Sequence, residues 1–591
     1  MKKIILILGL LACNCEVDAQ RIEIYPIVPG GASGGAAAGV TSIAAGSDIV
    51  NTLSNAPNNS AYQLGVGTYT VTPSIAGIGQ APGIGGGAGF TRAINLFNKT
   101  NISILGVPGR TIIDGGLAFD STNNLGEILL ATNCLNLYLY GITFRGQFLT
   151  NFTLWTNATL WAGIGLFNCK NVTIENCNVI DHFDQGIWDV AALSAVGPHC
   201  TNVNIINGLI QNIGSQRTNL GPSQPGDGAG IVPTGWRIEN VTFRDNWRHI
   251  EPFDEIDGYP FNSLVIKGCY FEGSIDSGIY TAGSTNCHNA LVTGNRIFQP
   301  RDYTRRGTNQ YQTASAIHFN AGQAPNIRDN VIEGYVAGVN LATATDMYGA
   351  QIVNNTFRYQ SNAAVASYAL YIGDLAVTAP RIKQAYIANN LIQGSQWFAM
   401  YVFGLADSVV ENNLFREPIT TGGFECVNLA GNAGANTNIL FMGNSIIDVG
   451  TLDIDAGFAI NSGQYIRFVN NDVQGTTMLY SNLVGAEVVI RQPPTIVSAT
   501  LVSGTYTNTQ RDTRIRIPNG STRTNKLNIP FNGHQVTVED NGMTASGTNI
   551  WVVATTGVIN NGPSLTNIAN NGGSITLEGD GTNWRIISRF P

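Results

Sequence analysis

Carboxylate side chains are concentrated in one part of a chain that is otherwise poor in charge. Charged residues make up 12% of the 591 residues, against roughly 25% in an average domain. The stretch RHIEPFDEID, residues 248–257, nevertheless holds four acids within seven positions. Glycoside hydrolysis needs two carboxyl groups flanking the bond, one to donate a proton and one to activate water or attack carbon. The candidate catalytic carboxylates are Glu251, Asp276, Asp184 and Asp254.

Glu251 paired with Asp276 or Asp184 is the favoured arrangement, because such sites are assembled from neighbouring segments of the chain. The alternative is that these are loop acids, which are solvated or cap turns. Calcium is a minor alternative, since several carboxylates could converge, but no loop has a calcium-binding signature. We therefore expect no cofactor and no metal.

A second set of residues recurs at one position of a repeated tripeptide. Segments such as GIW (186–188), GIY (278–280) and AIH (316–318) place an aliphatic residue in the middle. If that residue points inward along a strand, the next one points outward. The sequence thus predicts an exposed column made of Trp188, Val232, Glu251, Tyr280, His318, Asn340, Tyr371 and Tyr401.

Aromatic rings stack on the apolar faces of sugars, and polar groups bind sugar hydroxyls. The exposed column therefore predicts a groove for a polysaccharide or surface glycan, with Trp188, Tyr280, His318, Asn340 and Tyr371 as binding residues. The alternative is that the aromatic residues stabilise an exposed sheet through contacts between neighbouring strands.

A basic segment, QPRDYTRRGTNQYQ at 299–312, offers the parts of a different reaction. Elimination at a uronate needs a cation to neutralise the carboxylate and a base such as His or Tyr. Arg301 and Tyr303, with Arg248 from another segment, are the candidate substrate-binding residues, and His318 is the candidate base. The alternatives are a solvated surface loop and a structural histidine.

Other classes of function find little support. The chain has 31 Lys and Arg against 39 Asp and Glu, a net charge of −8, and nucleic-acid binding requires basic patches. There is no P-loop, dinucleotide fingerprint or HExxH motif. GASGG at 31–35 matches GxSxG, but it lies in a Gly/Ala-rich segment and not in a strand–turn–helix.

The elements that must position these residues form a repeat. Its pattern is Asn, Gly or Asp, then two residues, then Val, Ile or Phe, at intervals from 23 residues (412 − 389) to 35 (176 − 141). Such self-similarity with a local period of two predicts stacked parallel strands. The anchor residue tolerates a tight turn, and an Asn amide can bond to the Asn above and below. The anchors are Gly141, Asn176, Asn207, Asn240, Gly268, Gly294, Asp329, Asn354, Asn389, Asn412, Gly443 and Asn470.

The Asn turns and irregular rungs resemble the right-handed parallel β-helix of the pectate-lyase superfamily, and so do GVGTYTV (65–71) and NISILGVPGRTIIDGG (101–116). The resemblance implies an all-β chain with about 12–14 coils. It is specific for the fold and weak for function, since this fold hosts lyases, hydrolases, epimerases, tailspikes and adhesins. The catalytic Arg motif of the family is not matched, so none of its residues is carried over.

The cysteines follow the repeat. Cys134, Cys169, Cys200 and Cys287 each lie seven residues before an anchor, for example 141 − 134. This spacing predicts stacked thiols in the core. The alternative is a disulfide between neighbouring coils, either Cys134–Cys169 or Cys169–Cys200.

The chain divides by composition. Residues 1–19 read as a secretory signal peptide, with LLAC (10–13) as an alternative lipoprotein box at Cys13. A Gly/Ala-rich linker covers 20–40, the β-helix domain 41–490, and a small antiparallel β-sandwich 496–591. No later segment is long enough to span a membrane.

The phrase GGSITLEGDGTNWRIISR, residues 572–589, is similar to the small C-terminal β modules of phage tail fibres and spikes. That similarity implies a virion-associated homotrimer, whereas the signal peptide indicates a secreted or cell-surface protein. Two hypotheses of function follow: a tailspike-like protein that binds and depolymerises a glycan by carboxylate chemistry, and a non-catalytic spike or adhesin. A polysaccharide lyase is the further alternative.

Overall fold

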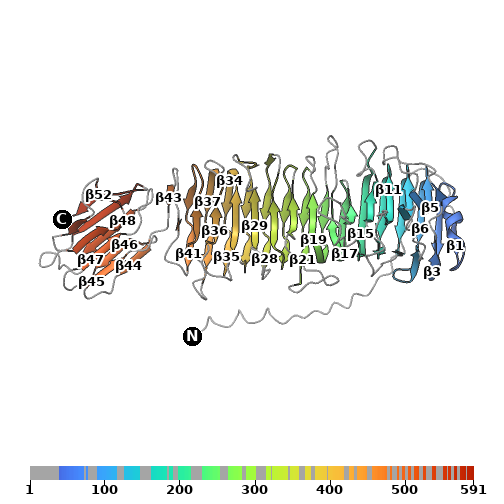
Figure 1. Ribbon diagram of the computed structural model, residues 1–591, viewed down its shortest axis with the longest axis horizontal. Helices are drawn as coiled ribbons and strands as arrows, with labels where there is room; N and C mark the ends of the chain where they lie inside the picture. Colours follow the sequence, from blue (N-terminus) through green and yellow to red (C-terminus); the bar gives the residue numbers. More distant parts are fainter. Residues whose placement is uncertain are drawn as a thin grey trace, which may run out of the picture. The chain divides into compact units, whose positions relative to one another are not determined.

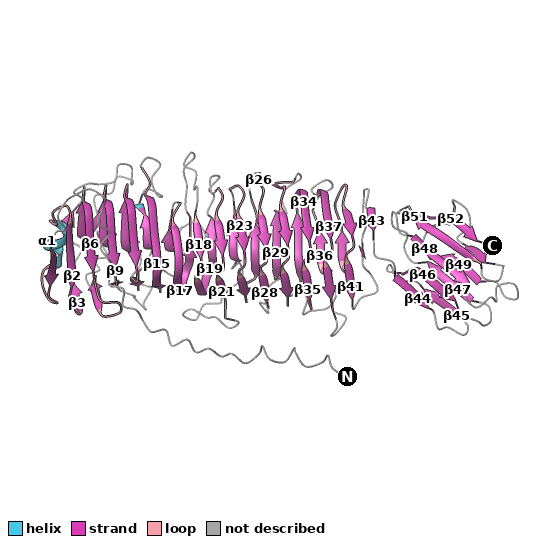
Figure 2. Ribbon diagram, turned by 180° about the vertical axis from the view of Figure 1, so that it is seen from behind, coloured by secondary structure: helices cyan, strands magenta, loops and turns pink. Residues whose placement is uncertain are grey.

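The computed structural model shows an all-β chain (Figures 1 and 2). Its one described helix, α1 (Ile49–Ser54), begins after Asp48, whose side chain accepts a hydrogen bond from the Asn51 amide. No described helix is long and apolar enough to cross a membrane. The described residues are 39–71, 75–76, 90–115, 125–146, 161–182, 185–190, 198–214, 229–233, 235–252, 264–281, 288–300, 315–320, 322–343, 346–358, 367–373, 380–395, 397–417, 425–431, 436–448, 456–474, 480–481, 489–491, 495–498, 504–507, 512–517, 523–527, 535–540, 550–555, 557–560, 565–568, 573–580 and 582–590.

The strands up to residue 491 belong to one coiled sheet with three faces, A, B and C, which the chain visits in that order in each coil. Face A carries the candidate site and has fourteen described members, whereas face B has sixteen, somewhat more than the predicted 12–14 coils. They are β5 (Phe90–Phe97), β8 (Leu125–Thr132), β11 (Trp161–Phe167), β14 (Gln185–Asp189), β16 (Ala229–Val232), the end of β17 (Arg237–Ile250), the end of β19 (Tyr270–Thr281), β22 (Ser315–Phe319), β25 (Ala337–Leu341), β29 (Tyr368–Gly373), β33 (Phe398–Phe403), β36 (Val427–Leu429), β39 (Phe458–Ile460) and β42 (Tyr480–Ser481).

Faces B and C complete each coil. Face B contains β1 (Val40–Ile43), β2 (Ser60–Leu64), β6 (Thr100–Leu105), β9 (Leu135–Tyr140), β12 (Lys170–Glu175), the start of β15 (Thr201–Gln211), the start of β17, β18 (Val265–Lys267), β20 (Leu291–Thr293), β23 (Asn326–Arg328), β27 (Gln351–Val353), β31 (Tyr386–Ala388), β34 (Leu405–Glu411), β37 (Thr437–Met442), β40 (Arg467–Val469) and β43 (Val489–Arg491). Face C contains β3 (Gly67–Thr70), β7 (Thr111–Asp114), β10 (Ile142–Arg145), β13 (Asn178–Ile180), the end of β15, the middle of β17, the start of β19, β21 (Arg296–Phe298), β24 (Val331–Glu333), β28 (Thr356–Arg358), β32 (Leu391–Gln393), β35 (Leu414–Arg416), β38 (Ser445–Ile447) and β41 (Asp472–Gln474).

Pairing between successive coils is parallel throughout the described part of this sheet, which makes it a parallel β-helix. The short β26 (Met347–Tyr348) and β30 (Ile382–Lys383) pair in the same way. The exception is β4 (Ile75–Ala76), which pairs antiparallel with β5.

The turns between strands explain the repeat. All twelve anchor residues have positive φ, from 50° to 58° at Asn and Asp and from 62° to 68° at Gly. Asn and Gly adopt this left-handed conformation with the least strain, so the predicted turn at the anchors is confirmed. The predicted bonding between asparagines of successive coils occurs mainly at the neighbouring position.

The interior asparagine ladder lies one residue after the anchors. From Asn295 onward the buried Asn side chains donate from Nδ2 to Oδ1 of the next coil over 2.9–3.1 Å. Each buried amide thereby has a partner, which avoids the cost of an unpaired polar group in the core. The ladder consists of Asn295, Asn330, Asn355, Asn390, Asn413, Asn444 and Asn471.

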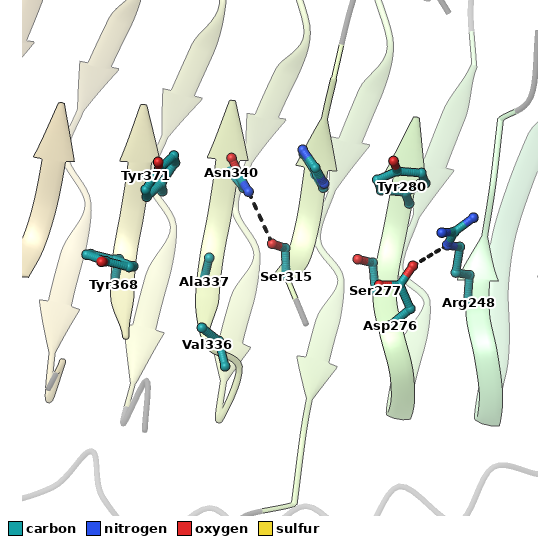
Figure 3. A pocket seen from close by; sticks show the side chains of 11 residues that line it. Arg248, Asp276, Ser277, Tyr280, Ser315, Val336, Ala337, Asn340, Tyr368 and Tyr371 are labelled. Carbon is teal, nitrogen blue, oxygen red and sulfur yellow. Dashed lines mark hydrogen bonds and ion pairs between the residues drawn. The ribbon is translucent and has the colours of Figure 1, made fainter. Parts of the chain in front are cut away.

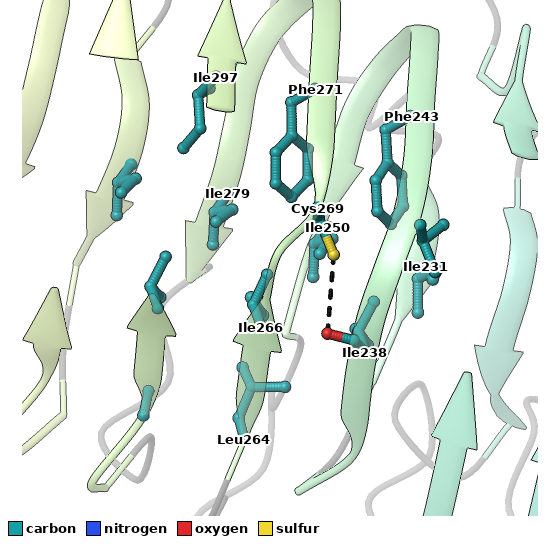
Figure 4. Packing of buried hydrophobic residues seen from close by; sticks show 14 of the residues in the cluster. Ile231, Ile238, Phe243, Ile250, Leu264, Ile266, Cys269, Phe271, Ile279 and Ile297 are labelled. Atoms are coloured by element: carbon teal, nitrogen blue, oxygen red, sulfur yellow. Dashed lines mark hydrogen bonds between the residues drawn. The ribbon is translucent and has the colours of Figure 1, made fainter. Parts of the chain in front are cut away.

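The core of the coils is built from stacked aliphatic and aromatic side chains. Ile231, Ile250 and Ile279 pair in register on face A and are fully buried. Phe243 and Phe271 stack in neighbouring coils with ring centroids 4.8 Å apart (Figure 4). Burying a side chain of this size stabilises the fold by about 1.5–3 kcal/mol. The inward direction that the sequence predicts for the middle residue of each tripeptide is therefore confirmed.

The described cysteines are packed in this core as free thiols. Cys134, Cys169 and Cys200 are buried in successive coils, and no disulfide links the described cysteines. The Cys134 and Cys169 thiols instead donate to the carbonyls of Leu96 and Ala131. These three residues are therefore packed thiols and do not form the alternative disulfides. Cys287 lies outside the described part of the chain.

The C-terminal strands form two further sheets around a separate core. One sheet has β44 (Thr495–Ser498), β46 (Asp512–Ile517), β48 (Gln535–Asp540), β51 (Ser574–Gly579) and β52 (Trp584–Phe590). The other has β45 (Gly504–Thr507), β47 (Arg523–Leu527), β49 (Ile550–Ala554) and β50 (Leu565–Ile568).

The predicted small β module is present, but its strands are antiparallel only in part. The chain alternates between the two sheets from β44 to β49, so strands that are neighbours within a sheet run in the same direction and pair parallel. Antiparallel pairing occurs at β49–β50, β48–β51 and β51–β52. Residues 1–19, the predicted signal peptide, lie outside the described residues.

Candidate functional site

Two outward-facing rows of side chains run along face A. The trailing row follows the buried aliphatic residue of each coil and contains, in paired register, Tyr280, His318, Asn340, Tyr371, Tyr401 and Asn428. The leading row lies three residues earlier in the chain and contains Arg248, Ser277, Ser315, Ala337, Tyr368 and Phe398. The side chains of the two rows form one surface.

The local backbone explains how residues three apart share a face. From Ser277 to Phe398, the residue after each leading-row position points at the next coil, where there is little room. A Cβ on Gly278, for example, would lie 2.5 Å from the carbonyl oxygen of Ala316. Gly or Ala at this position lets the strand place both flanking residues outward, whereas the Arg248 coil has the buried His249 there.

A hollow of about 390 Å³ lies between the rows (Figure 3). Its floor is formed by the small side chains Ser277, Ser315 and Ala337 in three successive coils, which lie about 4.8 Å apart. Arg248 bounds one end and Tyr368 the other. The volume is within the roughly 300–1,000 Å³ of small-molecule sites.

Charged groups gather at the Arg248 end. The Arg248 Nη1 lies 2.5 Å from Oε1 of Glu251, and its Nε donates to Asp276. The guanidinium also lies 4.2 Å above the ring of Tyr280. The Glu251 side chain is 4% exposed, whereas that of Asp276 is 22% exposed and lines the hollow. Asp276 is therefore the carboxylate that a ligand in the hollow would meet.

Two buried polar atoms in the trailing row have no hydrogen-bond partner among the described residues: Nε2 of His318 and Oδ1 of Asn340. The Asn340 amide donates from Nδ2 to the hydroxyl of Ser315 over 3.4 Å. Burial lowers the pKa of His318 to about 4, with the Asp276 carboxylate opposing and the Arg248 guanidinium reinforcing the shift. The imidazole is therefore neutral near pH 7.

Aromatic rings fill the other end. Tyr401 stacks on Phe398 at 4.6 Å and on Tyr368 at 5.4 Å, and Tyr371 meets Tyr368 edge-on at 5.4 Å. Contacts of this kind contribute about 0.5–1.5 kcal/mol per pair beyond the area they bury. These aromatic residues thus stabilise the sheet and also present a ring surface beside the hollow.

The predicted exposed column is wrong at Trp188 and Glu251. Trp188 is 1% exposed, because its partner in the preceding coil is Gly165 and its indole donates to the buried carboxylate of Glu127. Glu251 is 3% exposed, because Arg248 of the same strand covers it. From Tyr280 to Tyr401 the column lies half-buried and in register as predicted.

Several predicted site residues cannot be placed. Asp184, Asp254, Arg301 and Tyr303 lie outside the described residues, as does the side chain of Val232. Among the described residues, no group of three or more His, Cys, Asp or Glu side chains is arranged to hold a metal ion.

Apart from Arg248, the residues of the leading row were not predicted from the sequence. The same tripeptide alignment contains the signal for this row, at the residue immediately before each tripeptide. There the sequence reads Arg, Ser, Ser, Ala and Tyr at 248, 277, 315, 337 and 368. Three small residues between two large ones indicate a hollow once the coils are stacked.

Comparison with known proteins finds distant structural similarity and no relative by sequence. No family model and no curated protein matches the chain. Similar solved structures include the A-module of the mannuronan C-5 epimerase AlgE4 from Azotobacter vinelandii, at 13% identity over 74% of this chain and 93% of that one, with a TM-score of 0.31. The Dettilon tailspike protein is 13% identical over 88% of this chain and 70% of its own, with a TM-score of 0.35. A mannuronic acid specific polysaccharide family 6 lyase from human gut microbiota is 10% identical over 76% and 91%, with a TM-score of 0.34. Similarity at this level says nothing about which activity the chain has.

Proposed function

We propose that the hollow on face A binds a segment of a polysaccharide or surface glycan and that the protein hydrolyses a glycosidic bond there. The observation that carries the proposal is the hollow itself, with hydroxyl, amide and imidazole groups along its length and aromatic rings at both ends. An elongated surface with this mixture suits a chain of sugars, whose rings have apolar faces and polar edges.

The accessible carboxylate sets the chemistry. Hydrolysis adds water across the glycosidic C–O bond, so the leaving oxygen gains a proton and the anomeric carbon gains a hydroxyl. Asp276 is placed to activate that water or to attack the carbon. Glu251 is buried against Arg248 and acts as a positioning residue, which leaves Asp184 and Asp254 as the candidate proton donors.

Elimination is less well supported by the charges. Of the described residues that line the hollow, Arg248 is the one cation, and it already contacts the carboxylates of both Asp276 and Glu251. A uronate carboxylate would therefore enter a region with two negative charges and one positive charge. Uncharged sugars suit this end of the hollow better.

The test is incubation of the purified chain with panels of capsular and extracellular polysaccharides. New reducing ends indicate hydrolysis, and absorbance from unsaturated uronates indicates elimination. Binding without either product would favour the spike or adhesin hypothesis. If no polysaccharide is bound or cleaved, the proposed function is wrong.

Variants then assign the site. Asp276→Asn should retain binding and lose cleavage by a factor on the order of 10³ or more, since the reacting carboxylate is removed. Asp329→Asn is the matched control, because Asp329 is an anchor position where Asn is equally suited. Glu251→Gln should lose cleavage and also some stability, because breaking a buried ion pair costs about 3–5 kcal/mol when one partner is removed. Unchanged cleavage by Asp276→Asn would show that Asp276 is not the reacting carboxylate.

A further inference from the structure

The hollow is lined by two residues with a buried polar atom that has no hydrogen-bond partner among the described residues. One atom is Oδ1 of Asn340, which is an acceptor by chemistry and whose amide nitrogen already donates to Ser315. The other is Nε2 of His318, which donates or accepts according to the tautomer of the imidazole.

These two atoms lie in neighbouring coils. His318 pairs directly with Asn340, so the two residues stand about 4.8 Å apart along the trailing row. An unpaired buried acceptor costs about 1–3 kcal/mol, and a ligand that donates to it recovers that cost. Oδ1 of Asn340 therefore favours a ligand group with an N–H or O–H directed at this point.

The neighbouring part of the hollow is apolar with a hydroxyl beside it. Val336 and Ala337 line it with aliphatic carbon, and the ring of Tyr368 closes it. The Ser315 hydroxyl accepts from Asn340 and still has its own proton to donate. Acceptor, hydroxyl donor and apolar surface thus occur together within two coils.

We propose that this part of the hollow binds the acetamido group of an N-acetylated amino sugar. The inference rests on the proposed function, since it names the sugar class that the same site selects. The amide N–H donates to Oδ1 of Asn340, the carbonyl accepts from Ser315, and the methyl group packs against Val336 and Ala337. A hydroxyl at the same position lacks the methyl contact, and an ammonium would place a charge against the apolar wall.

The test uses matched oligosaccharides of N-acetylglucosamine, N-acetylgalactosamine and N-acetylmannosamine, with the parent hexoses and the free amines as comparison series. Affinities for the full chain are measured by calorimetry. We expect one N-acetylated series to bind at least about tenfold more tightly than its parent hexose and its amine, which corresponds to about 1.4 kcal/mol. Equal or tighter binding of the hexose or the amine overturns this inference and leaves the proposed function standing. If none of these oligosaccharides binds while another polysaccharide does, the inference is likewise overturned; if no glycan binds, both proposals fall.

Variants connect the preference to the residues. Asn340→Ala should reduce the ratio of the two affinities towards one, while Asn428→Ala, two coils beyond Tyr371 in the same row, should preserve it. A role of Asn340 in folding alone would lower both affinities and leave their ratio unchanged. Should Asn340→Ala melt early, Ala337→Val provides the second test, because the added methyl groups fill the space assigned to the acetyl group. An undiminished ratio in both variants would overturn the assignment.

Discussion

Two stretches of face A differ in one respect. In both, each coil has a buried aliphatic residue, a small residue before it and outward residues on either side, all in paired register. Between Arg248 and Tyr368 the leading row carries Ser277, Ser315 and Ala337, and the surface is hollow. From Tyr368 to Phe398 the same row carries rings that stack against Tyr401, and the surface is filled. The size of the side chain at one repeating position thus decides whether a regular coil carries a site.

Filling the hollow should have the largest effect. Ser315→Tyr places a ring in the middle of the floor, and we expect glycan affinity to fall by a factor on the order of 100. Ser445→Tyr, on face C, is the matched control and should leave affinity unchanged. Binding is measured by calorimetry, and a melting curve for each variant checks that the fold persists. Full affinity in Ser315→Tyr would place the glycan elsewhere.

Removing a ring from the filled stretch of the leading row should have an intermediate effect on glycan affinity. Tyr368→Ala removes the end wall of the hollow and the stacking partner of Tyr401. We expect roughly tenfold weaker binding and a loss of stability of about 1–3 kcal/mol, since the ring is only partly buried. Tyr386→Ala, at an exposed position on face B, should change neither quantity. If the two variants behave alike, the ring of Tyr368 is not part of the site.

The smallest expected effect is the loss of stability at acidic pH that comes from His318. The pKa of His318 is lowered to about 4 in the folded chain by burial, against about 6.5 when unfolded, so the unfolded chain binds the additional proton first. The contribution of His318 to the free energy of unfolding is therefore fully present above pH 6.5 and is lost as the pH falls towards 4. Between pH 7 and 5 we expect a loss on the order of 1 kcal/mol from His318, after allowance for its partial exposure.

His318→Asn should reduce the change in the free energy of unfolding between pH 7 and 5, as measured by unfolding in denaturant. His182, which is buried with its pKa also lowered to about 4, contributes in the same direction and is still present in that variant. His288→Asn serves as the control. An identical pH slope for His318→Asn and the unchanged chain would show that His318 is not buried as described.

The fold could be predicted from the sequence because the repeat has a local physical cause. Positive φ at the anchors favours Asn, Asp and Gly, and the alternation of strands places the aliphatic residues inside. The trailing row from Tyr280 to Tyr401 followed from the same alternation. These features depend on residues close together in the chain.

The errors came from contacts between distant residues. Trp188 is buried because Gly165 and Glu127 of earlier coils make room for it and accept its indole hydrogen. Glu251 is buried because Arg248 covers it, and no rule about alternation contains that ion pair. The direction of the C-terminal strands depends on which sheet each one joins, and the pattern of polar and apolar residues is the same for either direction.

The most direct test of the central claim is a crystal structure of Asp276→Asn with an oligosaccharide from a bound polysaccharide. We predict sugar density over Ser277, Ser315 and Ala337, bounded by Arg248 and Tyr368, with a donor group directed at Asn340. Density on another face, with the hollow holding only water, would contradict the account.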